Sequence, residues 1–352
     1  MSLTTSFERV ELPLENEFTI ARGSTTVAQN VIVRVEDAAG AVGVGAAAPS
    51  AHYGETADTV EAVLPSLLEE VEAVGDPHAL GEIERRLRET VTHNPAARCA
   101  VSIACHDLAA KRVGLPLYRL WGLDPDRAPT SSFTVGLDDT ERMREKTREA
   151  VEAGYTVLKT KLGTDRDREI VRAVREAAPD ARIRVDANEA WTPRETVRNS
   201  EWLAEFGVEF VEQPVPAGDP EGLQFAYENA VLPIAADESC VTLPDVPAVA
   251  DKCDIVNLKL MKCGGLRAAK RMIHTARAHG LEVMLGCMVE SNAAIAAGCQ
   301  LGPLLDYADL DGSLLLAEDP FDGVPLPDGE IRLDELDVSG TGARTTRPDE
   351  SR

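Results

Sequence analysis

Residues 183–186, Ile-Arg-Val-Asp, form a short strand-like run that ends in Asp186, and similar runs end in ionisable residues at nearly equal intervals. These positions are Lys161, Asp186, Glu212, Asp237 and Lys262, with gaps of 25, 26, 25 and 25 residues. A strand, a helix and two loops of a parallel barrel take about this many residues. The spacing therefore predicts one ionisable group per strand-helix unit, all at the end of the barrel where barrel enzymes carry out chemistry.

The same interval continues on both sides of these positions. Gly136 lies 25 residues before Lys161, Cys287 lies 25 after Lys262, and Asp311 lies 24 after Cys287. Eight strand ends with helical stretches such as 165–178 and 266–279 between them predict an α/β fold, a (β/α)7β modified TIM barrel that lacks its last helix. The expected strands cover residues 132–136, 156–162, 183–186, 209–212, 234–237, 255–260, 282–287 and 308–311.

The first part of the chain has a different pattern. Residues 1–50 read as strands, including 29–35 and 42–48, and helical spacing of apolar residues follows within 55–113. Strands followed by helices predict an α+β domain. We expect this capping domain over 1–123, the catalytic barrel over 124–318, a C-terminal segment over 319–344 that returns to the cap through a short strand near 329–333, and a disordered tail over 345–352.

Composition excludes several classes of function. The 352 residues carry a formal net charge of −24, which argues against nucleic-acid partners and anionic membranes. The acidity is spread along the chain, and only eight of the 36 basic residues are lysines, which favours the hypothesis of a high-salt host. The seven cysteines form no C-x-x-C pair, and no signal peptide or membrane-spanning run is evident, so we expect a cytoplasmic protein.

Asp186, Glu212 and Asp237 are the carboxylates of the series. Any one of them alone would be read as a helix cap or a surface ion pair. Three at successive strand ends would repel one another unless a cation lay among them. All-oxygen ligation favours Mg²⁺, with Mn²⁺ as the alternative, over zinc. The pattern therefore predicts a divalent metal site at the barrel mouth.

Lysines flank these carboxylates in the sequence. Lys159 and Lys161 are two residues apart, which puts both ammonium groups on one face of a strand, where each is expected to lower the pKa of the other. Lys161 could then act as a base near neutral pH. Lys262 comes four strands later and is expected to face Lys161 across the substrate; the alternative is a lysine at a helix start. Lys259 is interpreted as a residue that flanks the core.

Asp309 and Asp311 end the last expected strand, and their spacing points both side chains inward or both outward. They either anchor a substrate ammonium group or form a turn before Gly312. None of the six histidines falls at an expected barrel strand end, which disfavours a histidine base and the usual zinc sites. The glycine patterns of dinucleotide and P-loop sites are absent, so no nucleotide cofactor is expected.

Taken in order, these motifs resemble the enolase superfamily, muconate-lactonizing-enzyme subgroup, over nearly the whole chain. The matching segments are Lys159-Thr-Lys161, Asp186-Ala-Asn188, Glu212-Gln-Pro214, Asp237-Glu-Ser239 and Lys262-Cys-Gly-Gly265. The resemblance implies that Mg²⁺ is bound by Asp186, Glu212 and Asp237. It also implies that Lys161 and Lys262 are the paired acid/base catalysts, with Lys159 in support.

Within that subgroup, residues 259–265, 286–288 and 309–316 are similar to dipeptide epimerases of the L-Ala-D/L-Glu epimerase type. This implies Mg-dependent epimerisation of a dipeptide by two-base 1,1-proton transfer at an α-carbon through an enolate. The implied substrate-binding residues are Arg22, Thr134, Cys287, Met288, Asp309 and Asp311, with Asn188 and Glu238 as supporting residues. Homo-oligomerisation stays open, because no segment marks an interface.

Several alternatives share the metal and the lysines. They are o-succinylbenzoate synthase, muconate cycloisomerase and N-acylamino-acid racemase. Asp311 favours the epimerase over the first two, because their substrates carry no ammonium group. A metal-binding scaffold without turnover is the alternative from another class, and the competent residue at every catalytic position argues against it.

Overall fold

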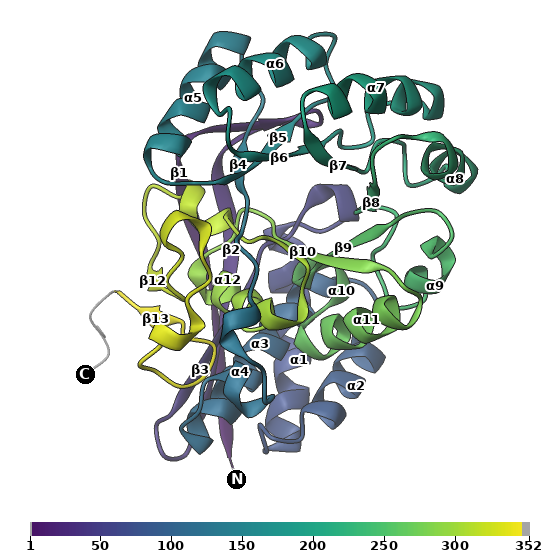
Figure 1. Cartoon of the computed structure of the whole chain (residues 1–352). Coiled ribbons are helices and arrows are strands. Elements are labelled where there is room, and N and C mark those ends of the chain that lie inside the picture. The colour runs from purple at the N-terminus through teal and green to yellow at the C-terminus, as the bar shows by residue number, and fades with distance from the viewer. Residues whose placement is uncertain (1, 347–352) are drawn as a thin grey trace.

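The computed structural model describes residues 2–346, in which a capping domain lies against a barrel (Figure 1). The cap contains an antiparallel sheet in the order β1-β2-β3. Its strands are β1 (Leu3–Ile20), β2 (Gly23–Asp37) and β3 (Val42–Ala47). The long β1–β2 hairpin reaches the barrel mouth, where the backbone N–H of Leu137 donates to the carbonyl of Thr19 at 2.8 Å. The cap is therefore in a position to contribute residues to a site in the barrel.

Four helices follow the cap sheet: α1 (Ala57–Val74), α2 (Leu80–Thr90), α3 (Pro95–Val113) and the short α4 (Leu117–Leu120). Helix α3 packs closely on β3 because two glycines of that strand carry no side chain. A Cβ on Gly43 would lie 2.1 Å from the carbonyl oxygen of Ala104, and a Cβ on Gly45 would lie 2.2 Å from that of Ala100. A larger residue at either position would force the helix away from the sheet.

Eight parallel strands form the barrel, and each pairs with the next along the chain. They are β4 (Phe133–Val135), β5 (Val157–Lys161), β6 (Arg182–Asp186), β7 (Val208–Glu212), β8 (Ile234–Ala236), β9 (Ile255–Lys259), β10 (Glu282–Gly286) and β11 (Tyr307–Asp309). A bridge between Ser131 and Ala308 joins the first and last strands and closes the ring. All eight predicted strands are confirmed, within two residues of their expected bounds.

Helices connect consecutive strands and cover the outside of the barrel (Figure 1). They are α5 (Thr140–Glu152), α6 (Asp167–Ala177), α7 (Pro193–Glu205), α8 (Pro220–Asn229), α9 (Asp245–Val249), α10 (Leu260–Cys263), α11 (Leu266–Ala278) and α12 (Asn292–Cys299). The predicted (β/α)7β order is confirmed. The single turn α10 was not expected; it begins directly after β9 and changes the direction of the side chains there.

Below the mouth, the barrel interior is filled by side chains. Phe210, Ala235, Ile255 and Met284 form a buried apolar cluster. Arg184 is buried beside this cluster, with its guanidinium carbon 5.5 Å from the centre of the Phe210 ring. Its Nε donates to the carboxylate of Glu209 at 2.9 Å. The charged group therefore has a partner inside an otherwise apolar floor.

The C-terminal segment passes back beside the cap, where a bridge joins Pro116 and Gly340. The strand expected near residues 329–333 is wrong, because a 3-10 turn (Pro327–Gly329) and a second one (Leu333–Glu335) occupy that stretch. The segment pairs instead through β12 (Phe321–Asp322) and β13 (Arg344–Thr345). Thr345, expected in the tail, therefore lies in a strand, and residues 347–352 lie outside the described part of the chain.

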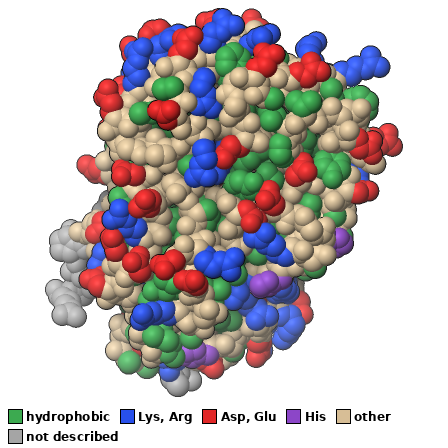
Figure 2. All heavy atoms as spheres, in the orientation of Figure 1, with side chains coloured by type: hydrophobic (Ala, Val, Ile, Leu, Met, Phe, Trp, Pro, Cys, Tyr) green, Lys and Arg blue, Asp and Glu red, His purple; other side chains and the backbone are tan. Residues whose placement is uncertain are grey.

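Acidic side chains are distributed over the visible face of the molecule and do not gather in one patch (Figure 2). This agrees with the even spread of acidic residues in the sequence. Among residues 2–346, no helix combines the length and the apolar character needed to cross a bilayer.

Candidate active site

The predicted carboxylates lie at the ends of three neighbouring strands. Lys161 of β5 pairs in register with Asp186 of β6, and Asp186 pairs in turn with Glu212 of β7. Asp237 directly follows β8. All three carboxylate residues are fully buried. The regular spacing in the sequence thus corresponds to one level of the barrel mouth, where three acids face a shared interior.

The ammonium group of Lys159 lies among these acids. Its Nζ is 2.8 Å from Oε2 of Glu212, 2.8 Å from Oδ2 of Asp309 and 3.4 Å from Oδ2 of Asp186. Burial alone lowers the pKa of Lys159, but the charges of Asp309, Glu212 and Asp186 outweigh it and raise the pKa well above its usual value. The expectation that Lys159 has a lowered pKa because of Lys161 is therefore wrong, since three acids surround it.

One side-chain oxygen of Glu212 is the feature that makes this site suitable for a divalent cation. Its Oε2 forms an ion pair with Lys159 but accepts no hydrogen bond. Burial, followed by the charge of Asp186, raises the pKa of Glu212 to about 7. A buried, under-satisfied oxygen among carboxylate donors suits Mg²⁺ or Mn²⁺. Asp186, Glu212 and Asp237 would hold such an ion, and the side-chain amide of Asn188 donates to Asp186 at 3.1 Å.

The backbone beyond two of these acids is left-handed at residues other than glycine. Asn188 and Glu189 have φ angles of 44° and 68°, and Gln213 has a φ of 33°. Such strain persists only where the surroundings hold it in place. The buried Gln213 side chain provides this hold, because its Oε1 accepts from the backbone N–H groups of Asp237 at 2.8 Å and Ser239 at 3.1 Å. The backbone N–H of Glu189 in turn donates to the Gln213 carbonyl at 2.8 Å, so both strained loops are tied to the third carboxylate.

A cavity of about 730 Å³ lies between the cap and the barrel mouth. Lys161 and Lys259 both line it, from the ends of β5 and β9. These strands are four places apart in a ring of eight, so the two lysines enter the cavity from opposite sides. The Nζ of Lys161 is 2.6 Å from Asp186 Oδ2, and the Nζ of Lys259 is 2.8 Å from Asp237 Oδ2.

Lys262 does not face Lys161 across the cavity, contrary to expectation. Strand β9 ends at Lys259, and the chain turns at once into α10, which carries Lys262 behind the strand end. Its side chain is 0% exposed and its Nζ is 2.6 Å from Asp237 Oδ1.

The 25-residue interval failed here because the inward-facing lysine lies 22 residues after Asp237. Lys259 lies on the same face of β9 as Asn257, whose side-chain amide donates to Glu212. The alternation of side chains along a strand could therefore have identified Lys259 as the inward-facing lysine.

Asp309 has both carboxylate oxygens engaged. Its Oδ1 accepts from the Ser132 hydroxyl at 2.6 Å, and its Oδ2 pairs with Lys159 at 2.8 Å. Burial raises the pKa of Asp309, but the charge of Lys159 outweighs it, and the net pKa is lowered. Although Asp309 lines the cavity, it serves here to balance the buried lysine.

Asp311 follows β11 in a turn and has a more open carboxylate. Its Oδ2 accepts from the backbone N–H of Thr134 at 2.6 Å, whereas its Oδ1 has the thiol of Cys287 at a long 3.9 Å. Burial, followed by the charge of Asp309, raises the pKa of Asp311 to about 6. Thr134, Cys287, Met288 and Asp311 all line the cavity. Of the two aspartates, Asp311 therefore has the oxygen available to a cationic group.

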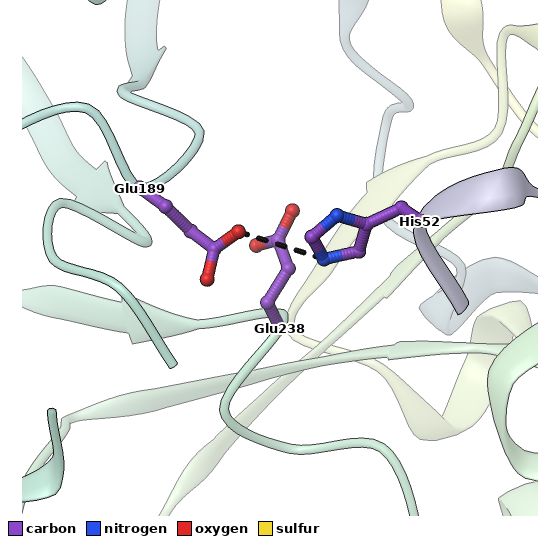
Figure 3. Close-up of side chains that lie close together, drawn as sticks. All are labelled: His52, Glu189 and Glu238. Carbon is purple, nitrogen blue, oxygen red and sulfur yellow. Dashed lines mark ion pairs between the residues drawn. The ribbon is translucent and has the colours of Figure 1, made fainter. Parts of the chain in front are cut away.

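Arg22 lies at the hairpin turn and lines the cavity, but two glutamates hold its guanidinium. It donates to Glu238 Oε1 at 2.7 Å and to Glu189 Oε2 at 3.3 Å. The Nε2 of His52 lies 3.5 Å from the same oxygen of Glu189. Figure 3 shows the side chains of His52 and Glu189 pointing toward each other, with Glu238 between them. Burial, followed by the charge of Arg22, lowers the pKa of His52.

His52, Glu189 and Glu238 offer ligand atoms within 4.8 Å of one another. Arg22 supplies the positive charge beside them in this structure. The sequence singled out Arg22 and Glu238, but not His52 or Glu189. Glu189 directly follows the Asp186-Ala-Asn188 strand end, which was an available signal; His52 lies in a cap loop with no comparable pattern.

Comparisons with known proteins match this arrangement over nearly the whole chain. Residues 3–122 match the family model of the mandelate racemase/muconate lactonizing enzyme N-terminal domain, and residues 142–346 match the enolase C-terminal domain-like model. The chain belongs to the mandelate racemase/muconate lactonizing enzyme family. The predicted membership of the enolase superfamily is thereby confirmed, together with the barrel-and-cap fold of this family.

Several members of this family are close to the chain. The L-Ala-D/L-Glu epimerase of Bacteroides thetaiotaomicron is 38% identical over 333 residues, 94% of this chain and 85% of that one. A dipeptide epimerase from Enterococcus faecalis V583, solved with Mg and L-Leu-L-Tyr, is 34% identical with a TM-score of 0.88, over 97% of this chain and 99% of that one. One from Cytophaga hutchinsonii, solved with Mg and D-Ala-L-Val, is 28% identical with a TM-score of 0.93, over 99% and 97%.

Proposed function

We propose that this family member is a Mg²⁺-dependent dipeptide epimerase, which inverts one α-carbon by two-base 1,1-proton transfer. The observation that carries the proposal is the pair Lys161 and Lys259, which line one cavity from opposite strands with buried carboxylates between them. The relatives described above act on or bind dipeptides with different side chains. The dipeptide backbone, with a free amine and a free carboxylate, is therefore the proposed substrate class.

The proposed roles follow from the positions of the residues. Asp186, Glu212 and Asp237 would hold Mg²⁺, whose positive charge would offset the negative charge that develops on the substrate carboxylate. One of Lys161 and Lys259 takes the α-proton from one face, and the other delivers a proton to the opposite face. Each lysine contacts a carboxylate oxygen in this structure, so a cation bound to those oxygens would compete with each ammonium group for its buried acid partner.

The ends of the substrate have their own proposed partners. Asp311 receives the free ammonium group, because its Oδ1 is the less engaged oxygen of the two aspartates. Arg22, held by Glu189 and Glu238, lines the cavity on the side of the cap. An open acceptor for an amine favours a dipeptide over the substrates of o-succinylbenzoate synthase and muconate cycloisomerase, which carry no ammonium group, and over N-acylated amino acids.

The test is α-proton exchange in a dipeptide library incubated in D₂O with Mg²⁺ and analysed by mass spectrometry. We expect one deuterium per molecule in the accepted dipeptides, with formation of the other stereoisomer. Absence of label in every dipeptide, with Mg²⁺ bound, would remove the epimerase proposal and leave the metal-binding scaffold.

We further propose that the enzyme works in the reducing cytoplasm, since all seven cysteines are free thiols. Analytical ultracentrifugation determines whether copies associate.

A further inference from the structure

The ammonium group of Lys262 is completely enclosed by acceptors. Its Nζ donates to Asp237 Oδ1 at 2.6 Å, to the Asp237 carbonyl at 2.6 Å, to the Asn257 carbonyl at 2.9 Å and to the Cys240 carbonyl at 3.0 Å. An ammonium group has three protons, so these four oxygens use its whole donor capacity. With a side chain that is 0% exposed, Lys262 has no donor left for a substrate.

These acceptors come from two consecutive units of the barrel. Asp237 and Cys240 belong to the loop after β8, and Asn257 belongs to β9. The Lys262 ammonium therefore fixes the loop that carries the third carboxylate to the strand that carries Lys259. Removing it would leave three carbonyl oxygens and one carboxylate oxygen without their buried partner.

Asp237 lies between two lysines with different surroundings. Its Oδ1 contacts the enclosed Lys262, and its Oδ2 contacts Lys259, which lines the cavity. With Oδ1 held from behind, the carboxylate keeps one orientation, in which Oδ2 points toward the cavity side. A freely rotating carboxylate would have to be ordered each time it bound a cation.

We propose that Lys262 is a positioning residue for the metal site: it holds the Asp237 carboxylate and its loop in the orientation that binds a divalent cation, and it does not exchange protons with the substrate. The inference rests on the proposed function for its catalytic consequence. It concerns metal affinity first, which can be measured whether or not a dipeptide turns over.

The experiment compares Lys262→Met, Lys262→Arg, Lys259→Met and the surface control Lys252→Met in the full chain. Titration calorimetry measures the Mg²⁺ and Mn²⁺ affinities, and circular dichroism checks that each variant is folded. Turnover is measured at increasing Mg²⁺ concentrations. We expect Lys262→Met to weaken metal binding by about tenfold or more, with activity that recovers as Mg²⁺ approaches saturation. Lys262→Arg keeps the charge and should recover part of the affinity. Lys259→Met should bind metal at least as tightly as wild type, while its turnover stays lost at saturating Mg²⁺.

A second measurement needs no variant of Lys262. Folded wild-type protein is treated with acetic anhydride, and modified lysines are identified by mass spectrometry. We expect Lys252 to be acetylated and Lys262 to stay unmodified until the protein unfolds. Acetylation of Lys262 in the folded protein would contradict its enclosure.

Two outcomes overturn the proposal and differ from failure of the proposed function. Wild-type metal affinity in a folded Lys262→Met variant rejects the positioning role. Loss of turnover in that variant that saturating Mg²⁺ does not restore, as expected for Lys259→Met, would make Lys262 a catalytic residue. If wild-type protein turns over no dipeptide, the proposed function fails, but the affinity and acetylation results still decide the role of Lys262.

Discussion

Lys161 and Lys259 end strands four places apart in the closed ring of eight, and both side chains line the same cavity. Each ammonium group contacts a different buried acid, Asp186 for Lys161 and Asp237 for Lys259. In the proposed mechanism, a substrate carbon held between them would have one lysine on each face. This relationship would account for inversion without any movement of the substrate, because deprotonation and reprotonation would occur on opposite sides.

Replacement of either lysine should therefore separate exchange from inversion. We expect Lys161→Ala and Lys259→Ala each to lower kcat for epimerisation by about 10³-fold or more. Each variant should still exchange deuterium into the one stereoisomer whose α-proton faces the remaining lysine, which NMR in D₂O detects. Lys252→Ala, at a partly exposed lysine outside the cavity, is the control and should behave as wild type. Inversion at full rate in the Lys259→Ala variant would remove Lys259 from the chemistry.

The two aspartates after β11 should respond differently to loss of charge. Asp311→Asn should raise KM about tenfold or more for dipeptides with a free amine, because a charged hydrogen bond to the ammonium group is lost. The same variant should leave any activity toward N-acetylated dipeptides unchanged. Asp309→Asn should instead lower the melting temperature, since Lys159 would lose one of its buried partners. Equal effects of Asp311→Asn on both substrate types would reject the ammonium contact.

Arg22 provides a test of the side chain accepted at the cap end. An acidic substrate side chain can recruit this guanidinium only in competition with Glu238 and Glu189. We expect Arg22→Met to lower kcat/KM for L-Ala-L-Glu by about tenfold or more and for L-Ala-L-Leu by less than about threefold. Steady-state kinetics on the two dipeptides measure this ratio. An equal decrease for both would show that Arg22 only organises the acids around it.

His106 should make the cap sensitive to acid. Burial lowers the pKa of His106 to about 4 from an ordinary 6.5, and its Nδ1–H donates to the carbonyl of Ser102 at 2.7 Å. Because the folded-state pKa is depressed, the stability from neutral His106 is present above pH 6.5 and is lost as the pH falls toward 4. We expect wild type to lose about 3 kcal/mol more than His106→Gln across this range. Urea unfolding at several pH values measures the difference.

The charge of −24 predicts that salt stabilises the fold. Repulsion among surface carboxylates should be screened between about 0.1 M and about 2 M KCl, so the free energy of unfolding should rise over this range. Guanidinium would itself screen charge, so urea is the denaturant of choice. Glycerol at matched osmolality is the control, because it leaves the charges unscreened. Equal stability at low and high KCl would reject a high-salt adaptation.

The barrel could be predicted from the sequence because its units are local and regular. Each apolar strand ends in a polar residue such as Asp186 or Glu212, and the next unit repeats the interval. The same regularity misdirected the assignment of the second lysine. The interval pointed to Lys262, whereas the strand ends three residues earlier at Lys259 and one turn of helix intervenes. Alternation along a strand was therefore a better guide to side-chain direction than distance between units.

The cap end of the cavity could not be derived in this way. Arg22 contacts residues that follow it by 166 to 216 positions, and no periodic pattern links such distant segments. Its pairing with Glu238 depends on the angle at which the hairpin meets the barrel. The partners of Asp309 present the same difficulty, because Ser132 and Lys159 become its neighbours only when the ring closes.

The filled barrel floor has a consequence for isotope experiments. Arg184, stacked beside Phe210 and paired with Glu209, fills the barrel interior below the mouth. Bulk water would therefore reach Lys161 and Lys259 through the cavity beside the β1–β2 hairpin, whose residues line it. A proton returned by the lysine that removed it regenerates the starting stereoisomer, whereas the product receives its proton from the opposite lysine. Deuterium uptake into unreacted substrate, measured relative to epimerisation in D₂O, therefore reports how fast the two lysines exchange with solvent through this cavity.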